Sequence, residues 1–205
     1  MSERKKSDKT VSELLARRKL KGGTQIEIVA YHEAGHAVAH VVLGIPFEKV
    51  TIESGDDSLG AVEFTRPSAV TSLWNDGDRE HPDVRDYMER ELIITCAGNF
   101  TQRRQFPRSR TNGIYKLGGK MLARRGSDLS QVTRLCHDMF QGEREVANAY
   151  ELFVAARARS LVAHYWSEIE TLAQALLERT TLTELEVRKL LCPPGMEGLL
   201  QSTAA

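Results

Sequence analysis

Residues 26–43 carry apolar side chains on almost every helical turn. The positions recur three or four apart: Ile26, Val29, Ala30, Ala34, Ala37, Val38, Val41 and Val42. Gly44 and Pro46 follow directly, and both residue types end helices. The pattern predicts one long, largely buried helix, around which the rest of the fold must pack.

Three polar residues interrupt this helix at a spacing typical of a metal site. His32, Glu33 and His36 form the pattern H-E-x-x-H. Helical residues four apart lie about 40° apart around the axis and about 6 Å along it, so both imidazoles can bind one Zn²⁺. Glu33 is suited to take a proton from a water held by such an ion. Burying these groups without a partner is costly, and a metal removes that cost.

A catalytic zinc site needs a third protein ligand and an open position for water. His40 is eight residues from His32, about 12 Å along a straight helix, which is too far for one ion. The spacing leaves open a carboxylate soon after the helix, such as Glu53 or Glu63, or one from a distant helix.

The remaining pattern predicts a mainly α fold with a small β element after the H-E-x-x-H helix. We expect strands at 49–53 and 60–65, and a loop or excursion over 66–90 that holds Pro67, Gly77 and Pro82. Apolar spacing returns at 92–100, and further helices are expected at 11–20, 127–139, 146–177 and 184–191. Thr183, just before the last of these, and Glu186, within its first turn, have capping-box spacing.

Composition favours a soluble, cytoplasmic protein. Apolar residues make up 41% of the chain, charged residues 27%, and the net charge is zero. The three cysteines are widely spaced, which fits reduced thiols, and no stretch approaches the ~18–20 apolar residues that span a bilayer. Residues 1–25 and 101–125 are basic, typical of solvated surface or of a contact arm for an acidic partner. Residues 101–125 contain no groove-reading motif, so we expect no nucleic acid as a partner. The zero net charge and the lack of a spanning stretch lead us to expect no membrane either.

Several segments resemble the peptidase domain of FtsH-type ATP-dependent zinc proteases. The resemblance covers the His-Glu-Ala-Gly-His-Ala helix at residues 29–38, Lys49-Val50-Thr51-Ile52, Leu59-Gly60, residues 127–133, and the closing helices at 169–191. It implies a zincin-like fold with zinc held by His32, His36 and Asp128, because the family's third ligand is an Asp at a similar helix start. It also implies Glu33 as the catalytic base.

The chain departs from this family in three places. Residues 97–102 replace the family's G-G-R-x-A-E segment, and Ser127 replaces the Asn before the ligand Asp. The sequence also has no G-x-x-x-x-G-K-[ST] loop, since Gly119-Lys120 is followed by Met121. The resemblance therefore implies a stand-alone peptidase without the ATPase and membrane helices.

These observations predict a zinc metallopeptidase domain at 26–192, a basic and partly disordered arm at 1–25, and a flexible tail at 193–205. We expect it to cleave unfolded or specific polypeptide substrates. The alternatives are a zinc-stabilised binding or adaptor module without proteolysis, or a subunit that works with a separate ATPase. The family's peptidase domains form rings, so a homo-oligomer is a further expectation.

Overall fold

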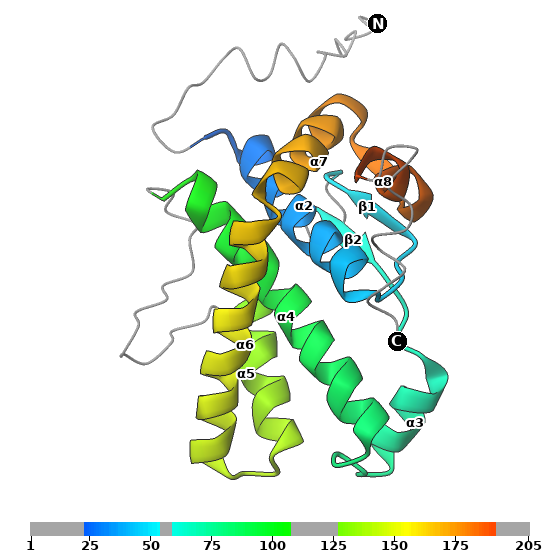
Figure 1. The fold of residues 1–205 in the computed structure, drawn as a ribbon, viewed down its shortest axis with the longest axis vertical. Helices are drawn as coiled ribbons and strands as arrows, with labels where there is room; N and C mark the ends of the chain where they lie inside the picture. The colour runs from blue at the N-terminus through cyan, green and yellow to red at the C-terminus, as the bar shows by residue number, and fades with distance from the viewer. Residues whose placement is uncertain (1–22, 54–58, 108–126, 192–205) are drawn as a thin grey trace, which may run out of the picture.

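The structure, a computed structural model, describes residues 23–53, 59–107 and 127–191. Its elements follow in the order α2 (Gln25–Leu43), β1 (Lys49–Thr51), β2 (Ala61–Glu63), α3 (Ser68–Asn75), α4 (Pro82–Gln105), α5 (Asp128–Met139), α6 (Arg144–His164), α7 (Trp166–Arg179), β3 (Thr181–Thr183) and α8 (Glu184–Leu191). This part is mainly helical with one small sheet, as expected (Figure 1). The helix expected at 11–20 and the tail at 193–205 lie outside the described residues.

The central helix α2 begins at a capping box and ends at a left-handed glycine. The Thr24 hydroxyl accepts a hydrogen bond from the Glu27 backbone N–H (3.3 Å), and the Glu27 carboxylate accepts one from the Thr24 N–H (2.7 Å). Gly44 ends the helix with φ +69°, a conformation that disfavours residues with a Cβ. Most of α2 is buried because it packs against both α4 and α7. The expected long buried helix is confirmed.

The sheet is antiparallel, in the order β2-β1-β3. In the centre of β1, Val50 lies opposite Val62 on one side and Leu182 on the other. The strands expected at 49–53 and 60–65 are present but shorter. The third strand was not predicted, because it joins segments 130 residues apart, where the Thr51 and Thr181 hydroxyls lie 2.7 Å from each other.

The expected loop over 66–90 is wrong, because α3 and the first turns of α4 occupy it. Pro67 and Pro82 stand at the starts of these helices, where a proline interrupts no internal hydrogen bond. The turn between them holds Gly77 at φ +86°. Arg66 ties this excursion to α4 through two bonds to the buried Glu91 carboxylate, 2.9 and 2.6 Å long.

The single helix expected over 146–177 is also wrong in part, because the chain breaks at Tyr165 into α6 and α7. Tyr165 leaves helical geometry at φ −100° and ψ 33°. The break lets α6 pack against α4 while α7 packs against α2. Trp166, just after it, stacks on Tyr31 of α2 and lies under the Arg104 guanidinium.

The capping box expected at the start of the last helix is confirmed. The Glu186 carboxylate accepts a hydrogen bond from the Thr183 N–H (2.8 Å), and the Thr183 hydroxyl accepts one from the Glu186 N–H (3.4 Å). Among the helices that the structure describes, none is long and apolar enough to cross a membrane.

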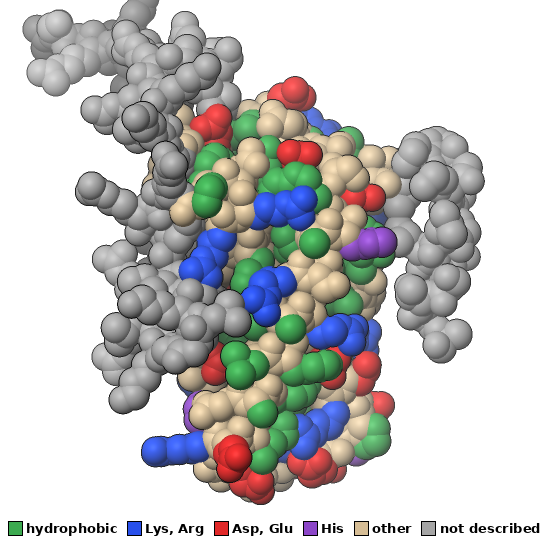
Figure 2. All heavy atoms as spheres, turned by 60° about the vertical axis from the view of Figure 1, so that its left-hand side comes forward, with side chains coloured by type: hydrophobic (Ala, Val, Ile, Leu, Met, Phe, Trp, Pro, Cys, Tyr) green, Lys and Arg blue, Asp and Glu red, His purple; other side chains and the backbone are tan. Residues whose placement is uncertain are grey.

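The outward side of α6 is a mixed surface. Leu152 and Phe153 are exposed there, and Figure 2, which brings the left of Figure 1 forward, shows hydrophobic side chains interspersed with Lys and Arg. Apolar side chains scattered in this way are ordinary on a protein surface.

Candidate metal centre

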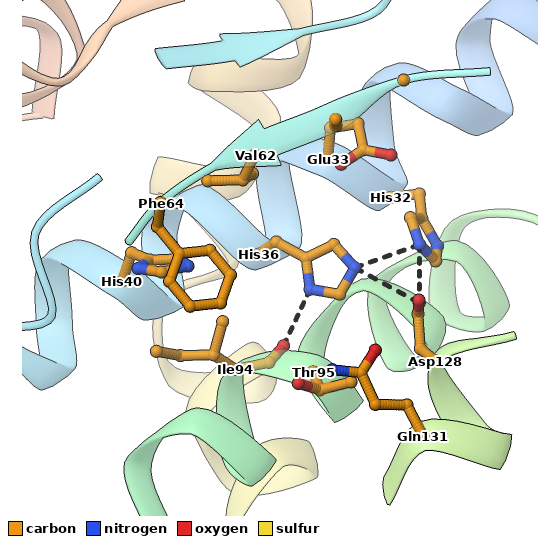
Figure 3. Close-up of a pocket in the computed structure, with 12 residues that line it drawn as sticks. His32, Glu33, His36, His40, Val62, Phe64, Ile94, Thr95, Asp128 and Gln131 are labelled. Atoms are coloured by element: carbon orange, nitrogen blue, oxygen red, sulfur yellow. Dashed lines mark hydrogen bonds and ion pairs between the residues drawn. The ribbon is translucent and has the colours of Figure 1, made fainter. Parts of the chain in front are cut away.

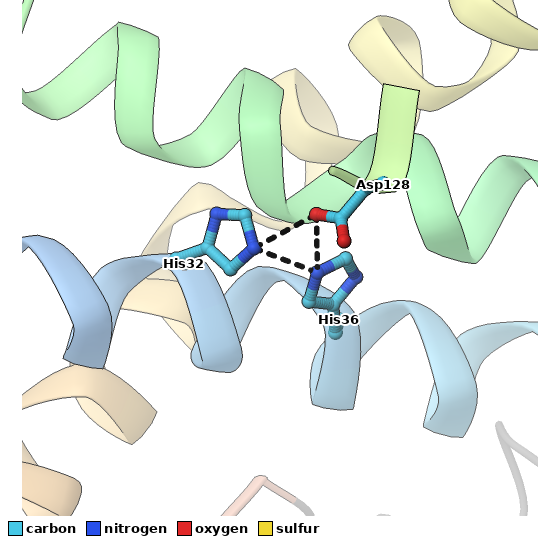
Figure 4. A group of neighbouring side chains, drawn as sticks. All are labelled: His32, His36 and Asp128. Atoms are coloured by element: carbon cyan, nitrogen blue, oxygen red, sulfur yellow. Dashed lines mark hydrogen bonds and ion pairs between the residues drawn. The ribbon is translucent and has the colours of Figure 1, made fainter. Parts of the chain in front are cut away.

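The two histidines of the H-E-x-x-H motif point their ring nitrogens at the same place. Their Nε2 atoms lie 3.1 Å apart, as expected for residues one turn apart on α2 (Figure 4). The His32 and His36 side chains are 19% and 11% exposed, so both are largely withdrawn from water while the shared point stays accessible.

Asp128 reaches this point from a different helix. It is the first residue of α5, which Ser127 caps by accepting a hydrogen bond from the Ser130 N–H (3.4 Å). Asp128 Oδ2 lies 2.9 Å from His32 Nε2 and 3.3 Å from His36 Nε2. Within the described residues, these three side chains form the one group of His, Cys, Asp and Glu whose ligand atoms converge in this way.

The other candidates for a third ligand lie elsewhere. Glu53 accepts a hydrogen bond from the Thr180 hydroxyl (3.0 Å), and Glu63 pairs with Lys49 (3.2 Å). His40 Nδ1 donates to the Ile45 carbonyl (3.0 Å) and its ring lies against Phe47 and Phe64. The structure therefore brings together the set that the resemblance implied and leaves the other carboxylates apart.

The separations of the converging atoms are close to those of ligands around a tetrahedral zinc ion. Tetrahedral ligands about 2.0–2.1 Å from one ion stand about 3.3 Å apart. The three measured separations run from 2.9 to 3.3 Å. Two imidazole nitrogens with one carboxylate oxygen are also a donor set that suits Zn²⁺. The residues present thus fit the metal that the motif implies.

Helix α4 orients two of these ligands. The Ile94 carbonyl accepts a hydrogen bond from His36 Nδ1 (2.8 Å), which leaves the lone pair on His36 Nε2. The Asn99 amide donates to Asp128 Oδ2 (3.0 Å). Asn99 lies in the 97–102 segment that departs from the family pattern, and it holds the carboxylate in place here.

Gly98 gives the His36 ring the room it needs. A Cβ at this position would lie 2.3 Å from His36 Nε2 and 2.7 Å from two of its ring carbons. Any larger residue would push the imidazole away from Asp128. This close approach of α4 to α2 therefore depends on glycine.

Glu33 lies beside the ligands in the same cavity. It is only 7% exposed, and Figure 3 shows its carboxylate on the His32 side. A Cβ on Gly60 would lie 2.9 Å from Glu33 Cγ, so this glycine lets the chain before β2 approach it. Burial raises the pKa of the Glu33 carboxyl, although the neighbouring histidines oppose the shift.

The charges of the three converging residues are strongly coupled. Burial disfavours a charge on His36, but the Asp128 carboxylate outweighs it and raises the pKa of His36 to about 9. Burial opposes the charge on Asp128 as well, yet the two imidazoles hold the pKa of that carboxyl far below its usual range. The arrangement stabilises a positive charge next to Asp128.

The cavity around these groups has a volume of about 230 Å³. The ligands and Glu33 form one part of its wall, and His40, Val62, Phe64 and Ile94 form an apolar part (Figure 3). Thr95 and Gln131 also line it. It lies between α2, α4, α5 and β2, so four segments that are distant in sequence build one site.

Sequence reasoning missed most of the residues that support the ligands. The Ile94 carbonyl belongs to the backbone and carries no signal in the sequence. Gly98 and Asn99 were noticed only as departures from a family pattern, and Gln131 not at all. Its spacing from Asp128, three residues along α5, would have placed both on one helix face.

Comparison of the chain with protein-family models and with curated proteins finds no match.

Proposed function

We propose that this protein is a zinc metallopeptidase, a relative of the FtsH peptidase domain with a zincin-like fold. One observation carries the proposal: His32, His36 and Asp128 converge on a single point, with Glu33 in the same cavity. Two of the segments that resemble the family, in α2 and at the start of α5, hold the three residues. Two others, in β1 and α7, pack against α2.

The three converging residues would hold the ion. When bound, Zn²⁺ supplies a Lewis acid that polarises a peptide carbonyl and acidifies water. Glu33 acts as the base: its carboxylate accepts a proton from the attacking water and later passes it to the nitrogen of the leaving amine. Burial raises the pKa of the Glu33 carboxyl, so this group holds an accepted proton more firmly than a solvent-exposed carboxyl does.

The position of the sheet supports an extended polypeptide as substrate. β2 is an outer strand of the described sheet, and Ala61 and Val62 line the cavity. An extended chain can lie along such a strand and bring its backbone to the ligands. We propose unfolded segments or one specific protein as substrates, or a separate ATPase that delivers them.

The test is cleavage of fluorescent casein by the wild type and by Glu33→Gln, with zinc measured in both. We expect about one zinc per chain in each protein, and a rate at least ~100-fold lower in the variant. Glu178→Gln is a matched control, because Glu178 is an exposed carboxylate near the end of α7 and does not line the cavity. It should cleave like the wild type.

The other outcomes are equally informative. Zinc in both proteins with no cleavage in either would favour the adaptor module. Cleavage that appears only with ATP and cell extract would favour a separate ATPase. Equal cleavage by Glu33→Gln and the wild type would rule out Glu33 as the base.

A further inference from the structure

Hydrolysis of a peptide bond needs a hydrogen-bond donor where negative charge develops on the carbonyl oxygen. Most side-chain donors around the cavity are already engaged. His36 Nδ1 donates to the Ile94 carbonyl, His40 Nδ1 to the Ile45 carbonyl, and the Thr95 hydroxyl to the Glu91 carbonyl (2.8 Å). Their hydrogens are not free for a substrate.

Gln131 is different. Its side chain lines the cavity, and among the described residues its amide has no hydrogen-bond partner. The amide offers two N–H donors and carries no charge, so it can approach a developing oxyanion without disturbing the charges of the ligands.

Helix α5 places Gln131 on the same side as the third ligand. Residues three apart face the same direction on a helix, so Gln131 stands one turn from Asp128. Figure 3 shows its amide turned toward Thr95, between α5 and α4. Gln131 is exposed, which places it at the mouth of the cavity rather than in its floor.

We propose that the Gln131 amide is a catalytic hydrogen-bond donor that binds the substrate carbonyl oxygen as it becomes negatively charged. The inference rests on the proposed peptidase function and adds a residue to it. A donor of this kind strengthens its bond as charge develops, so it lowers the barrier more than it tightens substrate binding.

The experiment compares Gln131→Met, which keeps the side-chain length and removes the donors, with Gln25→Met. Gln25 is an exposed residue at the start of α2, away from the cavity, so it controls for the substitution itself. We measure kcat and KM for casein, zinc content, and calorimetric affinity for N-phosphoryl-Leu-Trp and for unmodified Leu-Trp. The phosphoryl group stands in for a tetrahedral carbon with negatively charged oxygens.

We expect Gln131→Met to lower kcat by about 10- to 100-fold with KM within twofold, since Gln131 is only partly shielded from water. Affinity for N-phosphoryl-Leu-Trp should fall by a similar factor, with zinc content and Leu-Trp affinity unchanged. Gln25→Met should match the wild type throughout.

Two results would overturn the inference. If the wild type cleaves casein and Gln131→Met keeps its kcat and phosphoryl affinity, Gln131 is not the donor while the peptidase proposal stands. If the wild type neither cleaves casein nor binds N-phosphoryl-Leu-Trp, both proposals fail. A wild type that binds the phosphoryl compound without cleaving, and loses that binding in Gln131→Met, would support the donor alone.

Discussion

Replacing Gly98 with alanine should disable the proposed metal centre while leaving the helices intact. The added Cβ would lie 2.3 Å from His36 Nε2, whereas unstrained contacts of this kind are about 3.5 Å. The ring must therefore withdraw by about 1 Å. Metal–ligand distances tolerate deviations of only about 0.2 Å, so His36 would no longer reach an ion held by His32 and Asp128.

We expect the zinc affinity of Gly98→Ala to fall about 100-fold or more. Saturating zinc would then stabilise the variant by about 2.7 kcal/mol less than the wild type. The metal-free protein should change little or gain stability, because alanine in a helix interior is favoured over glycine by about 0.5–1 kcal/mol and the ring can turn aside.

The assay is competition with a chelator for zinc affinity, together with urea unfolding of both proteins with and without zinc. The metal-free pair is the control, since it separates damage to α4 from damage to the site. Wild-type zinc affinity in Gly98→Ala would refute the reasoning, because a displaced His36 could not then be a ligand. A large loss of stability without metal would instead show that the ring cannot move.

Two further predictions follow from the contacts around the site. Asn99→Ala removes the hydrogen bond to Asp128 Oδ2 and should weaken zinc binding about 10-fold in the same chelator assay. A change in zinc affinity within twofold would contradict the role of Asn99 in holding Asp128. His40 should make the free energy of unfolding decrease in acid. Burial lowers the pKa of His40 from 6.5 to about 4, so the unfolded chain binds a proton at this residue more readily than the folded protein does. The stability that neutral His40 contributes is therefore complete above about pH 6.5 and is lost as the pH falls toward 4. From pH 7.5 to 5 the wild type should lose about 2 kcal/mol more unfolding free energy than His40→Asn, measured by urea denaturation; parallel losses would show that His40 titrates normally.

Local patterns in the sequence were sufficient for the central helix and its motif. Apolar spacing and the residues Gly44 and Pro46 located α2 and its end, and the spacing of His32 and His36 placed their rings on one face. These features depend on hydrogen bonds and side-chain neighbours within a few residues, and such neighbours can be read from the chain itself.

The errors arose where local signals were ambiguous. The loop predicted over 66–90 rests on Pro67 and Pro82, yet a proline fits the first turn of a helix equally well. The break at Tyr165 is not marked by a glycine or a proline in the sequence. It depends on tertiary packing, since α6 and α7 pack against different helices. β3 could not be foreseen, since a three-residue strand forms only where β1 is already in place.

Only the tertiary structure brings Asp128 close to His32 and His36. Spacing alone left Glu53, Glu63 and a distant helix equally open, and family resemblance rather than physical reasoning favoured Asp128. The distances of 2.9 and 3.3 Å arise because α4 packs between α2 and α5, with Gly98 and Asn99 at the contact. Such distances depend on how side chains from several helices pack together, and no single segment contains that information.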